Sequence, residues 1–268
     1  LGDVYKRQVQ EAIFSSLFPN HPYGTQTVLG TQENLKNPSI TNIKNYYKQW
    51  YVPNNMAICM SGDLDPDATI ALIDKYFGGL KPNPELPKLD LPKETPITQP
   101  VVKEVLGPDA ESVALAWRFP GVSDKDFEIL QVVSQVLYNG KAGLIDLDLN
   151  QQQKVLNSYG YPMGLADYSA FILGGLPKQG QTLEEVKDLL LNEIKKLRAG
   201  EFDEKMLQAN INNFKLYELQ SMESNEGRAD IFVNSFINGT NWEDEVTAID
   251  RMAKLTKEDI CLLYTSPS

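Results

Sequence analysis

Apolar residues recur at helical spacing in three segments of the first eighty residues. These segments are residues 10–18, 40–50 and 66–77. Asp65 followed by Pro66 predicts the start of the third helix, because aspartate caps helix N-termini and proline fits their first turn. A short apolar run at residues 56–61 is bounded by turn residues, which predicts a buried strand.

The second half of the chain alternates between strand-like and helix-like patterns. Thr182 and Glu185 form a capping-box pattern, which predicts the start of a long helix that ends before Gly200. Apolar periodicity predicts strands at 101–106, 112–119 and 168–173, and helices at 124–138, 182–197, 202–219 and 224–236. Thr256 and Asp259 predict one more helix start.

Six prolines occur between residues 81 and 100. Proline lacks a backbone donor, so this stretch is predicted to be a semi-rigid domain linker laid over a surface rather than a helix or a central strand. It separates residues 9–80, interpreted as the C-terminal part of a first module, from a second module at residues 101–260. A strand, a glycine, a cap and a helix occur in that order in both, which suggests an internal duplication. On this alignment the second module is truncated at its C-terminal side.

The two ends of the chain differ from the rest. Residues 1–8 (LGDVYKRQ) and 261–268 (CLLYTSPS) resemble translated adaptor sequence, and no hydrophobic period continues from them into their neighbours. We therefore expect both segments to lie outside the natural fold. The alternative is that they are ordinary termini.

Composition excludes several classes of protein. The formal net charge is −11, which disfavours binding to nucleic acid or to an anionic membrane surface. No apolar run reaches the roughly 20 residues that span a bilayer. With Cys261 set aside, Cys59 stands alone, so no internal disulfide is expected.

Few residues are candidates for chemistry. The chain contains one histidine, His21, which we interpret as a loop residue hydrogen-bonded to backbone. Cys59 is predicted to be an inert thiol on a buried strand. The carboxylates of Asp63, Asp65 and Asp67 superficially resemble a calcium loop but lack its glycine and bidentate glutamate, so helix capping is the preferred interpretation.

Two further groups have structural explanations. Glu184 and Glu185 fit a charged first helical turn. The aromatic residues of the second predicted helix are expected to pack in a core: Tyr46, Tyr47, Trp50 and Tyr51.

Three motifs in order carry a resemblance to a known family. They are His21-Pro22-Tyr23-Gly24, Tyr51-Val52-Pro53-Asn54-Asn55-Met56 and Gly62-Asp63-Leu64-Asp65. Together with the segments GVSDKDFEILQVVSQVL and LRAGEFDEKMLQANINNF, this order resembles the M16 (insulinase, pitrilysin and mitochondrial processing peptidase) zinc metallopeptidases. The resemblance covers essentially residues 9–260.

The resemblance implies an α+β fold of repeated modules, each a mainly antiparallel sheet covered by helices. It also implies Zn²⁺ bound through an H-x-x-E-H motif and a later glutamate. A chain with one histidine cannot contain that motif, and the resemblance places all of these residues before Val9. We therefore assign no catalytic and no metal-binding residue in this chain, and leave its substrate contacts unknown.

The implied parent function is a zinc endopeptidase that hydrolyses peptides or unfolded proteins in a chamber formed with its remaining modules. This chain by itself is expected to be inactive. The alternative is a non-catalytic M16 half or subunit that serves as a chamber wall, and a third possibility is an unrelated α+β binding domain. Bacterial relatives of this kind often work in the cell envelope, but the sequence does not identify a compartment.

One loop has two interpretations. Residues 139–143 (NGKAG) stand where the resemblance implies the glycine-rich substrate loop of processing peptidase subunits, although this loop is much shorter. It lacks the length and the Lys-Ser/Thr pair of a phosphate-binding loop. Either it contacts substrate or it is an ordinary helix-ending turn.

Overall fold

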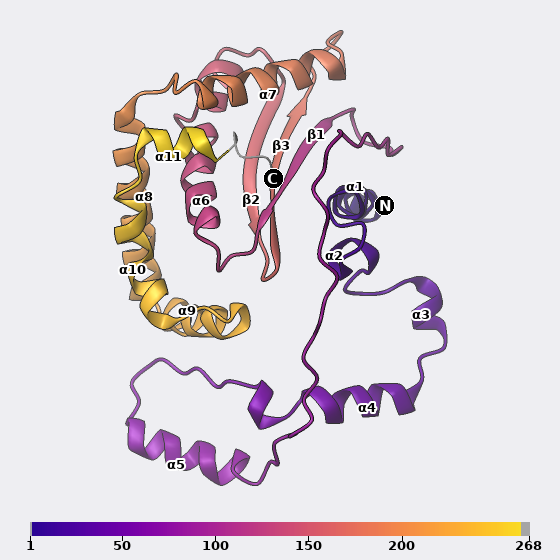
Figure 1. The fold of residues 1–268 in the computed structure, drawn as a ribbon, viewed down its shortest axis with the longest axis vertical. Helices are drawn as coiled ribbons and strands as arrows, with labels where there is room; N and C mark the ends of the chain where they lie inside the picture. The colour runs from indigo at the N-terminus through magenta and orange to yellow at the C-terminus, as the bar shows by residue number, and fades with distance from the viewer. Residues whose placement is uncertain (1, 264–268) are drawn as a thin grey trace.

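A three-stranded antiparallel sheet forms the centre of the computed structural model, which describes residues 2–263 (Figure 1). The strand order is β1-β3-β2, with β1 at Val113–Pro120, β2 at Asn157–Gly164 and β3 at Tyr168–Leu176. Strands β2 and β3 form a hairpin, and β1 pairs with the other edge of β3. The sheet confirms the α+β prediction for this half of the chain.

Strand β3 is central because its sequence is apolar or small on both faces. Seven consecutive residues, 169–175, are buried. A Cβ atom on Gly175 would lie 2.5 Å from Cγ1 of Val186, so this position must stay small for the covering helix to pack closely. The edge strand β2 tolerates Pro162, as edge strands do, because one row of its backbone groups has no ladder partner.

Helices α6 (Lys125–Leu137) and α7 (Leu183–Arg198) pack on one face of the sheet. Their apolar stripes form the main core with the inward residues of β1 and β3, and Leu130, Val133 and Leu190 are completely buried. Asp124 caps α6, and Thr182 with Glu185 forms the predicted capping box of α7. This layer was therefore predicted almost to the residue.

An outer layer of helices covers α6. It consists of α8 (Glu204–Glu223), α9 (Asn225–Asn238), α10 (Trp242–Met252) and α11 (Lys257–Leu262), which follow one another along one side of the molecule in Figure 1. Arg251 of α10 forms an ion pair with Glu128 of α6. Thr256 and Asp259 form the expected capping box at α11.

Helix α1 (Gly2–Leu17) packs near the opposite face of the sheet. Leu17 and Phe18 are buried there against Ala170 of β3. The helix starts at Gly2, so residues 2–8 are helical and continuous with the predicted helical segment 10–18 rather than separate from it. Residues 261–262 likewise belong to α11, and residues 264–268 lie outside the described part of the chain. Whether either end derives from an adaptor stays a prediction.

Helix α2 (Pro22–Thr25) folds back against α1, and the elements that follow it extend away from the sheet, as the purple ribbon of Figure 1 shows. These elements are α3 (Gln32–Lys36), α4 (Ile40–Trp50), the 3₁₀ turn η1 (Pro53–Asn55) and α5 (Pro66–Phe77). None of them contains a buried residue. The proline-rich segment 81–100 then returns to the sheet without helix or strand.

Several predictions for this region were wrong. Residues 56–61 and 101–106 form no strand, and Met60 and Val102 are 54% and 89% exposed. A strand needs a neighbouring strand for its backbone groups, and neither run has one within residues 2–263. The prediction of a buried strand around Cys59 fails for the same reason, and its thiol is half-buried.

The aromatic residues of α4 are not packed in a core. Tyr46, Tyr47 and Tyr51 are 61%, 60% and 55% exposed, and Trp50 is partly exposed. They contact one another instead, with Tyr47 and Tyr51 stacked at 4.7 Å between ring centroids. The described residues thus contain one sheet-centred module rather than two, which corrects the expected repetition within this chain.

Five elements were not predicted from the sequence: α2, α3, β2, α10 and the π-helical turn η2 (Asp146–Asn150). Strand β2 contains two glycines and a proline, which hide its alternation. Among residues 2–263, no helix combines the length and apolar character that crossing a bilayer requires.

Candidate functional site

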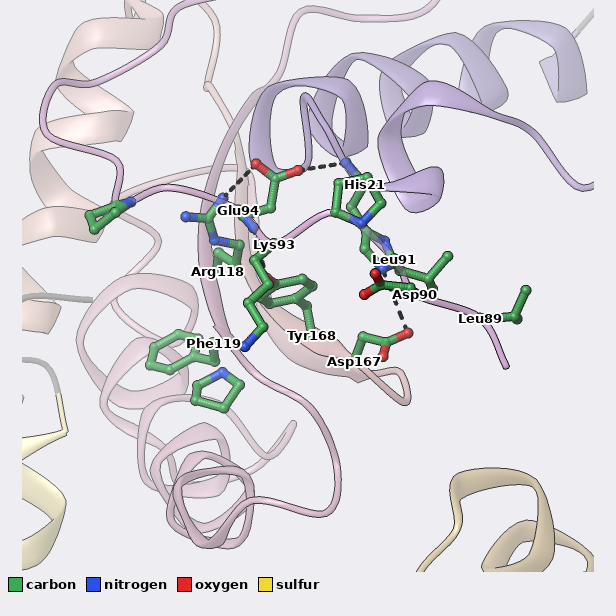
Figure 2. A pocket seen from close by; sticks show the side chains of 13 residues that line it. His21, Leu89, Asp90, Leu91, Lys93, Glu94, Arg118, Phe119, Asp167 and Tyr168 are labelled. Atoms are coloured by element: carbon green, nitrogen blue, oxygen red, sulfur yellow. Dashed lines mark hydrogen bonds and ion pairs between the residues drawn. The ribbon is translucent and has the colours of Figure 1, made fainter. Parts of the chain in front are cut away.

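An open hollow of about 530 Å³ lies where the proline-rich linker crosses the sheet (Figure 2). The proline-rich linker lines one side of the hollow, and the C-terminal end of β1 and the N-terminal end of β3 line another. The corner between α1 and α2 lines a third side. Its lining residues are His21, Leu89, Asp90, Leu91, Pro92, Lys93, Glu94, Pro96, Arg118, Phe119, Pro120, Asp167 and Tyr168.

The motif His21-Pro22-Tyr23-Gly24 builds the α1–α2 corner. Nδ1 of His21 accepts a hydrogen bond from the backbone N–H of Tyr23 at 3.2 Å and so caps α2, with Pro22 in the first turn. A Cβ atom on Gly24 would lie 2.2 Å from the carbonyl oxygen of Phe18. Gly24 therefore allows α2 to fold back closely on the end of α1.

Glu94 joins the linker to this corner. Its Oε1 accepts hydrogen bonds from the backbone N–H of His21 at 2.7 Å and of Asn20 at 2.8 Å, and its Oε2 accepts one from Nδ2 of Asn20 at 3.2 Å. The Glu94 side chain is 0% exposed. Burial by itself raises the pKa of Glu94, but these hydrogen bonds and the charge of Arg118 outweigh it and hold the pKa below its usual value.

Arg118 of β1 supplies the positive charge. Its Nη1 lies 3.5 Å from Oε2 of Glu94 and donates a hydrogen bond to the carbonyl oxygen of Leu17 at 2.6 Å. Its Nη2 donates to the carbonyl oxygen of Thr95. The guanidinium also lies over the ring of Tyr168, 5.7 Å from its centroid. One side chain thus connects the sheet, the end of α1 and the linker.

A second polar group lies at the other end of the hollow. The hydroxyl of Tyr23 donates to Oδ2 of Asp167 at 3.2 Å, and Nε2 of His21 lies 3.6 Å from the same oxygen. Because Nδ1 accepts a hydrogen bond, neutral His21 carries its proton on Nε2, which faces Asp167 in Figure 2. Burial raises the pKa of Tyr23, and although the hydrogen bond from the backbone N–H of Asp167 opposes this, the negative charge of Asp167 adds to the increase.

His21 therefore has the backbone hydrogen bond that its sequence context predicts, and it is 1% exposed. Asp65 and Glu185, two other candidates from the sequence, do not line this hollow. Asp65 caps α5 by accepting a hydrogen bond from the backbone N–H of Ala68 at 2.8 Å, as predicted. Glu185 belongs to the α7 capping box, and its backbone hydrogen bond with Thr182 lowers its pKa.

The loop at residues 139–143 is an ordered turn beside a second hollow of about 340 Å³. Oδ1 of Asn139 accepts hydrogen bonds from the backbone N–H of Lys141 and Ala142, and buried Asp146 accepts those of Asn139 and Gly143. Gly140 has a φ of 77°, which favours glycine. This geometry satisfies the helix-ending interpretation, and a substrate contact stays a prediction.

The buried acid Glu193 serves the packing of α7. It forms an ion pair with Lys196 at 2.9 Å, and Lys196 also binds Asp148 of η2 at 2.6 Å. Burial raises the pKa of Glu193 more strongly than Lys196 lowers it. The cluster connects α7 to the π-helical turn, and no cavity borders it among the hollows described above.

The zinc ion implied by the resemblance does not fit the described residues. A catalytic zinc needs three protein ligands and an open position. Within residues 2–263, no group of three or more His, Cys, Asp or Glu side chains is arranged to hold a metal. Nδ1 of His21 and both oxygens of Glu94 are already used in hydrogen bonds. We therefore derive no chemical step through zinc in this chain.

Sequence reasoning missed Glu94, Arg118 and Asp167. Glu94 is one of several carboxylates in the linker, and its partners lie 73 and 24 residues away along the chain, so no local pattern marks it. Arg118 did give a signal: it is a cation inside the apolar strand sequence VALAWRFP. A charge at such a position predicts a buried counter-charge, although it does not identify which residue provides it.

The sequence of this chain is similar to that of one known protein family. Residues 39–214 match the family model described as the Peptidase M16 inactive domain. The chain is 27% identical over 245 residues to the zinc protease PqqE of Helicobacter pylori, covering 88% of this chain and 53% of that protein. The chain therefore spans about half the length of this curated relative.

Solved structures of two proteases have a fold similar to that of this chain. The crystal structure of a protease from Helicobacter pylori has a TM-score of 0.80 at 22% identity, over 97% of this chain and 68% of that one. The first half of the periplasmic protease PqqL from Escherichia coli has a TM-score of 0.67 at 15% identity, over 98% and 59%. Because the family model covers well over half of these residues, the chain belongs to the M16 peptidase family and contains its inactive-type domain.

Proposed function

We propose that this chain is part of a longer M16 zinc metalloendopeptidase that hydrolyses peptides or unfolded proteins inside an enclosed chamber. In this proposal the zinc site lies on residues upstream of the chain, and the chain supplies part of the chamber wall. The observation that carries the proposal is the match of residues 39–214 to the family's inactive domain, within a chain that spans 53% of a zinc protease.

The exposed apolar surface of residues 28–106 supports a larger assembly. Ile70, Leu72 and Tyr76 of α5 are 63%, 55% and 68% exposed, and α4 shows the same character. Large exposed apolar surface is uncommon on soluble proteins that function as monomers, and it typically marks an interface. We propose that the remaining M16 modules of the parent cover it, so that the repeated-module architecture exists in the parent rather than in this chain.

The test compares the complete reading frame with the 268-residue chain. Both proteins are purified with zinc and assayed with a fluorogenic peptide, and the bound metal is quantified. We expect one zinc per complete protein, peptide hydrolysis that is lost when the glutamate of H-x-x-E-H is changed to glutamine, and neither property in the 268-residue chain. Stoichiometric tight zinc on that chain would contradict the proposal.

A non-catalytic M16 half or subunit is the second candidate function. It is favoured by the description of the matched model, which is that of an inactive domain. The same reading frame separates the two functions, because a structural subunit would lack an intact H-x-x-E-H. In that case the complete protein would bind no zinc alone, and activity would appear only when it is combined with a catalytic M16 partner.

A further inference from the structure

The linker contact described above has the form of an occupied binding site. We propose that the α1–α2 corner and Arg118 form a carboxylate socket, and that Glu94 fills this socket in cis so that the linker acts as a strap rather than a passive tether. The socket is defined as the backbone N–H groups of Asn20 and His21, Nδ2 of Asn20 and the guanidinium of Arg118.

The chemistry of the socket selects a carboxylate. Three N–H donors from the corner converge on the two oxygens of one carboxylate, at 2.7, 2.8 and 3.2 Å, and the guanidinium adds a positive charge at 3.5 Å. Hydrogen bonds to an ionised acceptor are stronger than neutral ones, and burial strengthens the attraction to Arg118. A neutral side chain cannot provide this charge complementarity.

The strap has additional attachments on both sides of Glu94. The backbone N–H of Glu94 donates to the hydroxyl of Tyr168 at 2.8 Å, and the carbonyl oxygen of Thr95 accepts from Arg118. Figure 2 shows the Glu94 carboxylate between Arg118 and the backbone of His21. These contacts fix residues 94–95 to β1, to β3 and to the α1–α2 corner. The contacts of Glu94 with His21 and Tyr168 join segments that lie more than 70 residues apart in the sequence.

Other charged residues that line the hollow lie outside the socket. Asp167 accepts from Tyr23, and Lys93 lies on the other side of the linker from the Glu94 carboxylate in Figure 2. Arg118 is therefore the cation that lies within ion-pairing distance of Glu94 among the described residues. The socket should stay formed when Glu94 is removed, because Arg118 is also held by the carbonyl oxygen of Leu17.

Chemical rescue tests the proposal on the 268-residue chain. Glu94→Ala should lower the Tm, and sodium acetate should raise it again in a saturable manner, by roughly 3–5 °C near saturation. Sodium chloride at equal ionic strength should not. Glu85→Ala, which removes an exposed carboxylate from the same linker, should show neither loss nor rescue. Adding Arg118→Met to Glu94→Ala should abolish the acetate effect.

Equal Tm values of Glu94→Ala in acetate and chloride would overturn the proposal. If Glu94→Ala does not fold, Glu94→Gln decides the question, because it keeps the shape and one acceptor but loses the charge. The backbone amides of Asn20 and His21 should then exchange hydrogen at least about 10-fold faster than in the unsubstituted 268-residue chain, while exchange in α7 is unchanged. Unchanged exchange at both amides would refute the socket.

Discussion

Residues 28–106 and residues 113–260 use similar helical patterns but reach different degrees of burial. Helix α7 buries five residues, including Leu190 and Leu197, whereas α5 has comparable apolar residues and buries none. The difference is that α7 lies on a sheet, while α5 extends into space in Figure 1. An amphipathic pattern thus predicts that a helical face will be covered, but not what covers it.

The largest expected contrast comes from the same substitution in the two regions. Leu190→Ala should lower the free energy of unfolding by about 2–5 kcal/mol, because Leu190 is completely buried and its removal leaves a cavity. Leu72→Ala should change it by less than about 0.5 kcal/mol, because Leu72 is 55% exposed. Urea unfolding of both variants measures the difference.

The complete reading frame sharpens this comparison. If other M16 modules cover α5, Leu72→Ala should approach the cost of Leu190→Ala in the complete protein. Equal, negligible effects of Leu72→Ala in both proteins would contradict the proposed covering of this helix.

Gly24 gives the next largest effect. Gly24→Ala should destabilise the chain by about 1–3 kcal/mol, because its Cβ would contact the backbone carbonyl of Phe18, which cannot move without displacing α2 from α1. Gly79→Ala is the matched control, since a Cβ there has no atom within 4 Å. Thermal unfolding of the two variants checks the prediction, and equal Tm values would refute it.

The two capping boxes provide a smaller contrast. Thr182→Ala should reduce the free energy of unfolding by about 1 kcal/mol, because the cap of α7 supports the core. Thr31→Ala removes the same type of box from α3, which contains no buried residue, so it should loosen that helix without a measurable change in global stability. Denaturant unfolding and amide exchange in α3 distinguish the two outcomes.

The smallest expected effect is on the pH dependence of stability. The folded-state pKa of Glu94 is lowered, so its contribution is complete above the usual glutamate pKa and is lost as the pH falls below it. The folded-state pKa of Glu193 is raised by burial, so its contribution is complete at low pH and is lost as the pH rises through the folded pKa.

Substitution by glutamine separates these two carboxyl groups. Glu94→Gln should reduce stability at neutral pH more than at acidic pH, whereas Glu193→Gln should remove part of the decline toward neutral pH. Unfolding measured across the acidic and neutral range checks the signs. Parallel profiles for the two variants would contradict the opposite shifts.

The chain's local elements were readable from local signals. Asp65 and the pairs Thr182–Glu185 and Thr256–Asp259 marked helix starts that the structure confirms, because capping involves residues only three positions apart. The order of the motifs indicated the M16 family, which the family model confirms. The single histidine excluded an H-x-x-E-H motif from these residues by counting alone.

Tertiary structure decided everything that depends on a distant partner. Residues 56–61 and α4 have no sheet to pack on in the folded chain. Residues 157–164 form strand β2 despite Pro162, because β3 pairs with the full length of one of its edges. Tertiary structure also brought Glu94 of the linker to Arg118 and to the backbone of His21. Sequence determines which groups need a partner, whereas only the folded chain selects that partner, because the choice depends on contacts between segments that are far apart in sequence.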